Sequence, residues 1–249
     1  MIRTADLELN PRKLRRGLQL TGDTALSLRF TRAVQPSFDA VARHPYFAAF
    51  ARDLTLAQLH KGMLGFYPTV EAFPRFMAAI LSRIEPRAEK RSNEARSWLM
   101  RNISVEEKHR EWWVDAGEPL GLDEGHYLEH RPSAKMAAQS HFLFEMSHAA
   151  PIGEAVAAVN YAVEGATGVW AREMQSSFRT RLESLGLPAT GRVVRWLDAH
   201  AQYDDIHPIE ALEVVKIFCP GEAAMDRAAQ AAVRSLDYYA MALDDALEA

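Results

Sequence analysis

Two histidines and an aspartate are spaced so that together they could hold a metal ion. His200, Asp204 and His207 stand at positions i, i+4 and i+7. In an α-helix this spacing places all three side chains along one stripe. Imidazole and carboxylate groups that converge in this way are typical ligands of redox-active first-row metals such as iron. Taken alone, the segment has an alternative interpretation as a solvated helix face with satisfied histidines.

Glu106 and His109 form a second candidate pair of ligands. They stand at i and i+3, so both side chains can face one point from the same helix. Carboxylate-bridged di-iron bundles use a Glu-x-x-His pair of this kind to hold a metal ion from one helix. The pair is weak support by itself, because a glutamate three residues before a histidine is common on solvated helices.

Glu164 lies in an apolar stretch in which a carboxylate needs a partner. It is the only charged residue between Glu154 and Arg172. Isolated burial of its charge would cost several kcal/mol, so the side chain should be paired, protonated or bound to a cation. Gly165 and Gly168 each lower helix propensity by about 1 kcal/mol. They either open room for a ligand or let another helix approach closely.

These three segments together supply three carboxylates and three imidazoles. One metal that must also bind oxygen does not need six protein ligands, whereas two metals with open positions do. We therefore predict a dinuclear site whose ligands are Glu106, His109, Glu164, His200, Asp204 and His207. The set mixes imidazole with carboxylate and has no thiolate, which favours iron over zinc, with manganese as an alternative.

The composition bounds the class of protein. The chain has 249 residues and a net charge of -4, which fits one large helical domain with an ample core. It has no basic stripe interleaved with aromatic residues, so we expect no nucleic-acid partner. Without a long apolar run we expect no membrane span. Cys219 is the only cysteine, so no intrachain disulfide can form, and with no signal-peptide pattern we expect a cytoplasmic protein.

Helical periodicity dominates after the first part of the chain. Residues 1–33 show no sustained periodicity and predict an irregular or partly helical lead-in, whereas residues 34–249 predict one all-α domain of about eight or nine helices. Prolines between residues 68 and 86 predict kinks or boundaries. Gly121–Pro132 predicts a loop, and residues 151–184 predict one long apolar helix.

Pro208 modifies the interpretation of the first stripe. The residue before a proline is disfavoured in the α conformation, so His207 is a poor mid-helix residue. A proline is well suited to the start of a new helix. We therefore expect His200 to end one helix, and Asp204 and His207 to lie on a turn that leads into the next. Such a segment should hold one metal more weakly than the other.

Three blocks of the sequence resemble the haem-oxygenase-like di-iron oxidases, which share a helical fold with haem oxygenase, thiaminase II and the pyrroloquinoline-quinone synthase. The blocks are Arg96–His109, Asn160–Gly168 and His200–Glu213, with weaker likeness over residues 59–78. Many members of the family hold the first Glu and His farther apart. The i, i+3 spacing here is most similar to a branch of bacterial decarboxylases that convert medium-chain fatty acids to terminal alkenes.

The resemblance implies a role for every candidate ligand. The positions that match the better-occupied iron, and so the catalytic centre, are Glu106, His109 and His200. Those that match the second iron are Glu164, Asp204 and His207. The resemblance also implies two iron ions, O2 as co-substrate, a small apolar carboxylic acid as substrate and an external electron donor. The sequence leaves a homodimer open.

An apolar substrate needs an apolar cavity beside the metals. Helical spacing from the ligands, and the apolar stretch around residues 66–73, nominate seven residues as walls, although core packing is an alternative role for each. They are Phe66, Tyr67, Phe73, Trp113, Ala157, Tyr161 and Gly168.

Two other functions remain open. The same di-iron fold could oxygenate an amine or cleave an amino acid, which a buried Arg or Asp near the metals would favour. A metal-free binding or regulatory protein of this fold would fail to bind iron. Thiaminase II chemistry uses a cysteine, and Cys219 is a poor match because it lies beside Pro220 at a predicted helix end.

Overall fold

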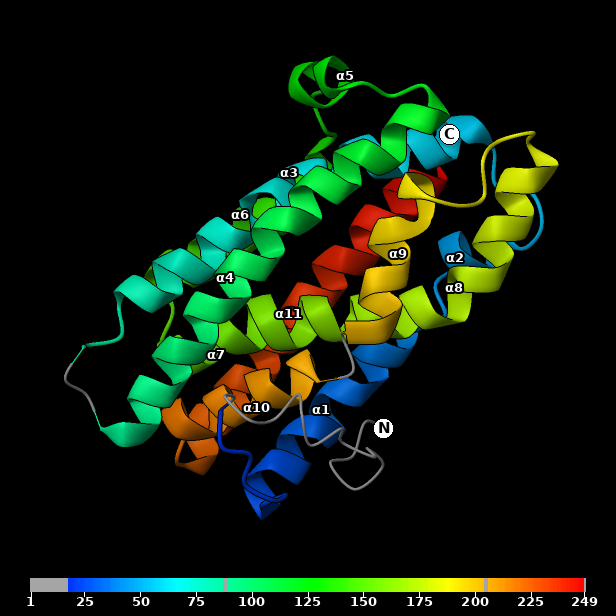
Figure 1. Ribbon diagram of the computed structural model, residues 1–249. Helices are drawn as coiled ribbons and strands as arrows, with labels where there is room; N and C mark the ends of the chain where they lie inside the picture. The colour runs from blue at the N-terminus through cyan, green and yellow to red at the C-terminus, as the bar shows by residue number, and fades with distance from the viewer. Residues whose placement is uncertain (1–17, 87–88, 204–205, 249) are drawn as a thin grey trace.

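The computed structural model describes residues 18–86, 89–203 and 206–248. These residues form helices and no strand (Figure 1). In chain order the elements are α1 (Ala25–Ala42), α2 (Pro45–Phe50), α3 (Leu56–Ser82), α4 (Lys90–Gly117), η3 (Glu118–Leu120), α5 (Glu124–Glu129), α6 (Ala134–Ala149), α7 (Ile152–Val156), η4 (Ala157–Glu164), α8 (Gly165–Ser184), α9 (Arg192–Tyr203), α10 (His207–Phe218) and α11 (Glu222–Leu247). The prediction of a single all-α domain is confirmed.

The helix α11 is the centre of the bundle. It contacts α1, α3, α6 and η4, and Figure 1 shows it running behind α4 and α9 through the middle of the molecule. Small residues such as Ala228, Ala232 and Ala242 are buried along it, which lets the neighbouring helices pack closely. No helix in the described part of the chain is both long and apolar enough to cross a membrane.

The first described helix begins earlier than the sequence pattern indicated. The predicted lead-in was residues 1–33, but α1 starts at Ala25, and residues 1–17 lie outside the described part. Thr24 caps this helix, because its side chain accepts a hydrogen bond from the Ser27 amide while Ser27 bonds back to the Thr24 amide. Such a capping box is a local signal for a helix start.

Two predicted interruptions of the chain are less complete than expected. Pro68 and Pro74 lie inside α3, which continues through both of them, because its many buried side chains offset the backbone hydrogen bonds that the prolines remove. The predicted loop at Gly121–Pro132 contains the short helix α5, which Asp123 caps.

The long apolar helix predicted over residues 151–184 is present but is not α-helical throughout. The segments α7, η4 and α8 follow one another without a break, and η4 is a π-helix of eight residues. A π-helix takes more residues per turn than an α-helix, and such segments are frequent at functional sites. The extra width changes which side chains share a face just before Glu164.

A buried carboxylate fastens α10 to the rest of the bundle. Glu213 is 3% exposed and forms ion pairs with Arg91 of α4 and with Lys216. It also accepts hydrogen bonds from the amide and hydroxyl of Thr21. The N-terminal segment, α4 and α10 therefore meet at one charged group, and this contact helps to position the start of α10, where His207 lies.

Replacing Glu213 by alanine should lower the free energy of unfolding by about 2–4 kcal/mol, because two cations would lose a buried partner. Urea unfolding followed by circular dichroism measures this change. Glu222→Ala is the matched control, since the Glu222 side chain is 75% exposed and its loss should cost no more than about 0.5 kcal/mol. Equal unfolding midpoints for the two variants would contradict the structural role of Glu213.

Candidate metal centre

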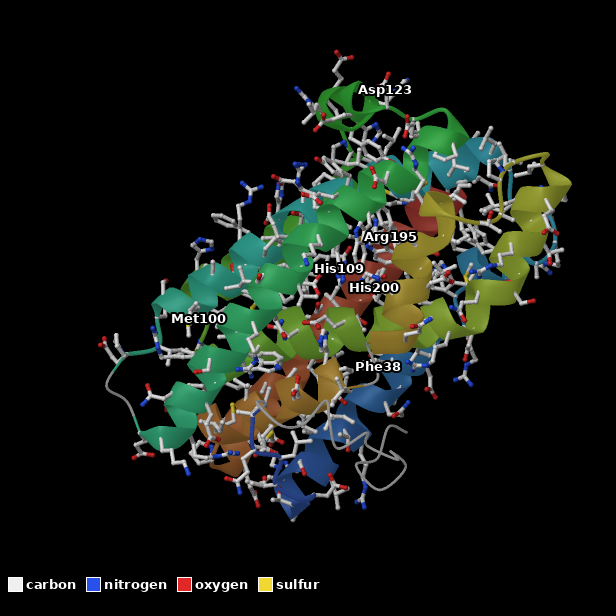
Figure 2. All side chains as sticks on the ribbon, viewed as in Figure 1. Phe38, Met100, His109, Asp123, Arg195 and His200 are labelled. Carbon is white, nitrogen blue, oxygen red and sulfur yellow. The ribbon has the colours of Figure 1, made fainter. Side chains whose placement is uncertain are left out.

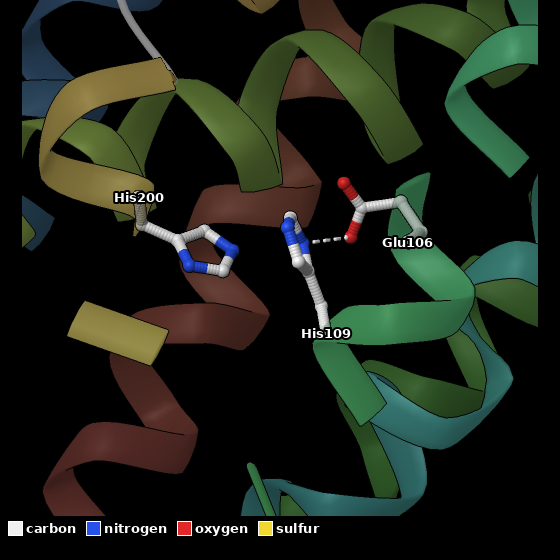
Figure 3. A group of neighbouring side chains, drawn as sticks. All are labelled: Glu106, His109 and His200. Atoms are coloured by element: carbon white, nitrogen blue, oxygen red, sulfur yellow. Dashed lines mark hydrogen bonds and ion pairs between the residues drawn. The ribbon is translucent and has the colours of Figure 1, made fainter. Parts of the chain in front are cut away.

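Three buried side chains from two helices meet in the middle of the bundle. Glu106 and His109 come from α4, and His200 comes from α9 (Figures 2 and 3). One potential ligand atom of each lies within 4.8 Å of those of the other two. The Nδ1 atom of His109 is 2.8 Å from Oε2 of Glu106, and the centres of the two imidazole rings are 4.4 Å apart.

A second group of candidate ligands shares Glu106 with the first. It consists of Glu106, Glu164 and His207, whose ligand atoms also lie within 4.8 Å of one another. Glu164 ends η4, and His207 is the first residue of α10. Nδ1 of His207 is 2.9 Å from Oε2 of Glu164. The structure therefore brings together five of the six predicted ligands, while Asp204 lies outside the described residues.

The backbone around His200 determines which ring nitrogen can bind a metal. Nδ1 of His200 is 2.8 Å from the carbonyl oxygen of Trp196, one turn earlier in α9. A carbonyl oxygen only accepts hydrogen bonds, so Nδ1 carries the proton and donates it. The other ring nitrogen, Nε2, is then the one that can bind a metal, and the hydrogen bond fixes the orientation of the ring.

The π-helix orients Glu164 in a comparable way. Nδ2 of Asn160 donates a 2.6 Å hydrogen bond to Oε1 of Glu164, and both residues are buried. Oε2 of Glu164 lies 2.9 Å from Nδ1 of His207. One oxygen is thus held by an amide, and the other faces the imidazole of His207.

Two of the candidate ligands, His200 and Glu106, have pKa shifts that favour the protonation state that binds metals. Burial, together with the neighbouring His109, lowers the pKa of His200 to about 3, so its imidazole is neutral at physiological pH. Burial alone would raise the pKa of Glu106, but the hydrogen bond and the charge of His109, with His200 and His207, lower it. Metal ions bind neutral imidazole and ionised carboxylate, so neither group needs to lose a proton first.

The residues present fit a metal site better than they fit an ordinary buried ion-pair network. Glu106 and Glu164 are both buried, and no described Lys or Arg forms an ion pair with either one. Burial of two carboxylates without a cation is costly. Cations bound between them would remove that cost, and a donor set of imidazole and carboxylate without thiolate suits iron or manganese.

An apolar cavity of about 140 Å³ opens onto the ligands. Its wall includes Glu106, His109, Glu164 and His200, and most of the remaining lining is aliphatic or aromatic. One wall of the cavity is a stripe of side chains along α8, which consists of Thr167, Trp170, Met174 and Phe178. From Thr167 to Phe178 an α-helix rises about 16 Å, so the cavity is elongated along α8.

The predicted wall residues are only partly placed at this cavity. Phe66, Phe73 and Trp113 line it. Four others do not, namely Tyr67, Ala157, Tyr161 and Gly168.

Ala157 and Tyr161 were expected at the cavity from α-helical spacing, but both lie in the π-helix η4, where that spacing does not hold. Tyr161 packs instead against Phe30 and Phe38 on the α1 side, and Ala157 is fully buried in the core. On α8, Thr167 lines the cavity in place of Gly168. Tyr67 packs against Tyr127.

Several residues at the site were not identified from the sequence. Trp196 stacks on His200, and the spacing of four residues between them is a signal that could have revealed it. Tyr239 and Gln139 line the cavity from α11 and α6, and no local pattern connects them with the ligands. Near the second group, burial raises the pKa of Glu210, which accepts a 2.8 Å hydrogen bond from Nε1 of Trp98.

Cys219 is remote from this chemistry. Its thiol is buried against Gly153, it does not line the cavity, and burial raises its pKa to about 11. A thiol that stays protonated at neutral pH is a poor nucleophile. The position of Cys219 thus agrees with the sequence-based argument against thiaminase II chemistry.

Replacing His200 by alanine should remove the metal position formed with Glu106 and His109, because it removes the only ligand that α9 contributes to that group. Iron per chain, measured by elemental analysis after anaerobic loading, should fall. His148→Ala is the matched control, since His148 is exposed and bonds to Phe144 of its own helix. Unchanged iron content in His200→Ala would refute the assigned role.

The chain is similar in fold to several proteins of known structure. A crystal structure of a TenA homologue from Pseudomonas syringae pv. tomato is 26% identical, with a TM-score of 0.84, over 94% of this chain and all of that one. A domain of unknown function with a haem-oxygenase-like fold from Shewanella denitrificans is 16% identical, with a TM-score of 0.73, over 89% of this chain and 91% of that one.

A TenA homologue from P. horikoshii is 15% identical, with a TM-score of 0.65, over 90% of this chain and 99% of that one. No curated protein matches the sequence. The sequence model of a family described as iron-containing redox enzymes matches residues 63–240, which include all six candidate ligands. The chain has a haem-oxygenase-like fold and belongs to the family of iron-containing redox enzymes.

Proposed function

We propose that this protein is a non-haem di-iron oxidase that uses O2 to decarboxylate a medium-chain fatty acid to a terminal alkene. The observation that carries this proposal is the pair of ligand groups that share Glu106 and open onto a long apolar cavity. Bound iron would supply O2 activation and one-electron chemistry. The protein would hold the substrate, orient it and exclude water.

The charge of the cavity wall indicates where a substrate carboxylate would bind. No Lys, Arg or Asp is among the described lining residues, and the only carboxylates there are Glu106 and Glu164. A fatty-acid carboxylate in this cavity would therefore find no cationic side chain, and only the metals could compensate its charge. Among the described lining residues, the absence of an Arg or Asp argues against a polar amine or amino acid as substrate.

The length of the cavity matches an extended alkyl chain. A substrate whose carboxylate lies at the metal end would run along the stripe from Thr167 to Phe178, parallel to α8. Thr167 and Trp170 both form hydrogen bonds with the hydroxyl of Tyr239. Because these polar atoms are already paired, the stripe offers an alkyl chain an apolar surface without unsatisfied donors.

The two metal positions should differ in strength. His200 and His109 are 6% and 4% exposed, whereas the His207 side chain is 13% exposed and begins a helix directly before Pro208. A ligand on a helix start is held by fewer neighbours than one in mid-helix. We therefore propose that the position formed with Glu164 and His207 binds iron more weakly, with Asp204 as its further ligand.

The direct test of the function is anaerobic loading with ferrous iron, followed by O2 and a series of medium-chain fatty acids. We expect transient visible absorbance and terminal alkenes in the headspace, each with one carbon fewer than its acid. A protein that takes up no iron would instead be a metal-free binding or regulatory member of the fold. Iron uptake without alkene from any acid would remove the decarboxylase assignment but leave the oxidase.

The cavity predicts a change in chain-length preference. Met174→Trp adds volume on the stripe, ten residues beyond Glu164, so acids long enough to reach it should lose binding while shorter acids keep it. O2 consumption and product yield across the acid series measure this shift. Ser176→Trp, at an exposed position of the same helix, is the control. Equal loss for short and long acids would contradict the proposed orientation.

A further inference from the structure

Four of the five tryptophans in the chain contact a candidate ligand or another of these indoles. They are Trp112 and Trp113 of α4, Trp170 of α8 and Trp196 of α9. Indole is among the most easily oxidised side chains in proteins. A group of indoles in contact with metal ligands can therefore exchange single electrons with an oxidising centre.

Trp196 is in direct contact with a candidate ligand. Its ring stacks on the imidazole of His200, with centroids 3.7 Å apart and planes inclined by 27°. Trp196 is 9% exposed. Its Nε1 atom is buried and has no hydrogen-bond partner among the described residues. An oxidised indole loses its proton readily only where an acceptor is present, so Trp196 would keep its proton and pass the charge onward.

Two further indoles contact Trp196 and are closer to solvent. The ring of Trp113 lies 4.7 Å from that of Trp196 in an edge-on arrangement, and the ring of Trp170 lies 5.8 Å from it and is stacked. Both are half-buried. Nε1 of Trp113 donates to the carbonyl of Met63, and Nε1 of Trp170 donates to the hydroxyl of Tyr239.

Trp112 has a different environment, although it is also near the site. Its ring centroid is 5.3 Å from that of His109. The guanidinium carbon of Arg195 lies over its face at 4.4 Å, and Arg195 is an exposed residue of α9 near His200 (Figure 2). A cation on the ring face stabilises the neutral indole but repels a positive charge on it. Trp112 should therefore resist oxidation.

We propose that Trp196 is an electron relay between the metal centre and the half-buried indoles Trp113 and Trp170. This inference rests on the proposed iron-dependent use of O2. In the absence of substrate, Trp196 would give up one electron through His200 to bound iron that O2 had oxidised, and the indole would become a radical cation. Trp196 keeps its N–H proton, and no covalent bond forms or breaks in the transfer.

The relay is completed toward the surface. Trp113 or Trp170 returns one electron to Trp196 and becomes oxidised in its place. A small one-electron reductant of the ascorbate class then restores that indole. The net result is that an oxidising equivalent moves away from the ligand histidines to half-buried indoles of the cavity wall, which the reductant restores. Substrate turnover consumes the same equivalent, so the relay operates mainly in the absence of substrate.

The experiment is freeze-quenched paramagnetic resonance on the full-length protein, loaded with ferrous iron and mixed with O2 without fatty acid. Protein labelled with ring-deuterated tryptophan identifies the radical, because deuteration narrows its lines. Tryptic mass spectrometry of the same samples locates oxidised indoles. We expect a tryptophan radical, suppressed by ascorbate, and oxidation products at Trp113 and Trp170.

Variants separate a relay from incidental oxidation. Trp196→Phe keeps an aromatic ring against His200 but should lose the radical at unchanged iron content. Trp113→Phe should shift the oxidation products to Trp170. Trp112→Phe and Trp98→Phe are controls that should leave the radical unchanged. Trp112 has the Arg195 guanidinium over its ring, and Trp98 donates its N–H to Glu210. A full radical signal in Trp196→Phe, or oxidation mainly at Trp112 or Trp98, would overturn the relay.

The outcomes also distinguish this inference from the proposed function. Consumption of O2 by the iron-loaded protein with no tryptophan radical would overturn the relay alone. Failure to bind iron or to consume O2 would overturn the proposed function, and the relay with it.

Discussion

The structure depends on one electrostatic constraint, the burial of Glu106 and Glu164 at the centre of an otherwise apolar bundle. Neither carboxylate forms an ion pair with a described Lys or Arg, and each faces an imidazole at hydrogen-bond distance. Such an arrangement is costly unless cations are bound between the groups. The hydrogen bond from Asn160 occupies Oε1 of Glu164, and the hydrogen bond to the Trp196 carbonyl occupies Nδ1 of His200. Oε2 of Glu164 and Nε2 of His200 are therefore the atoms left to bind a metal.

Much of this site could be predicted from the sequence, because helical periodicity converts spacing into direction. The pair Glu106 and His109 lies on α4 as their spacing predicted. The split between His200 and His207 was also predictable, since a proline favours the start of a new helix, and α9 and α10 are separate. His207 itself was expected on the turn, but it is the first residue of α10. That the three segments would meet at one point could not be derived from periodicity and depended on the chemistry of the residues.

Other features could not be predicted, for identifiable physical reasons. The early start of α1 was missed although Thr24 and Ser27 form a capping box, because the apolar pattern of the following residues is weak. Tyr161 was misplaced because no sequence signal distinguished the π-helix from an α-helix. Gln139 and Tyr239 reach the cavity from helices remote in sequence, and only tertiary packing brings them there.

The π-helix makes the site sensitive to chain length more than to residue identity. Each residue of an α-helix advances the rotation by about 100°, so removing one residue from Ala157–Glu164 would turn all of α8 relative to α7. The cavity stripe would then face a different helix, even though every side chain remained. A single insertion or deletion in η4 would therefore move the cavity stripe of α8 away from Glu106, His109 and His200 on α4 and α9.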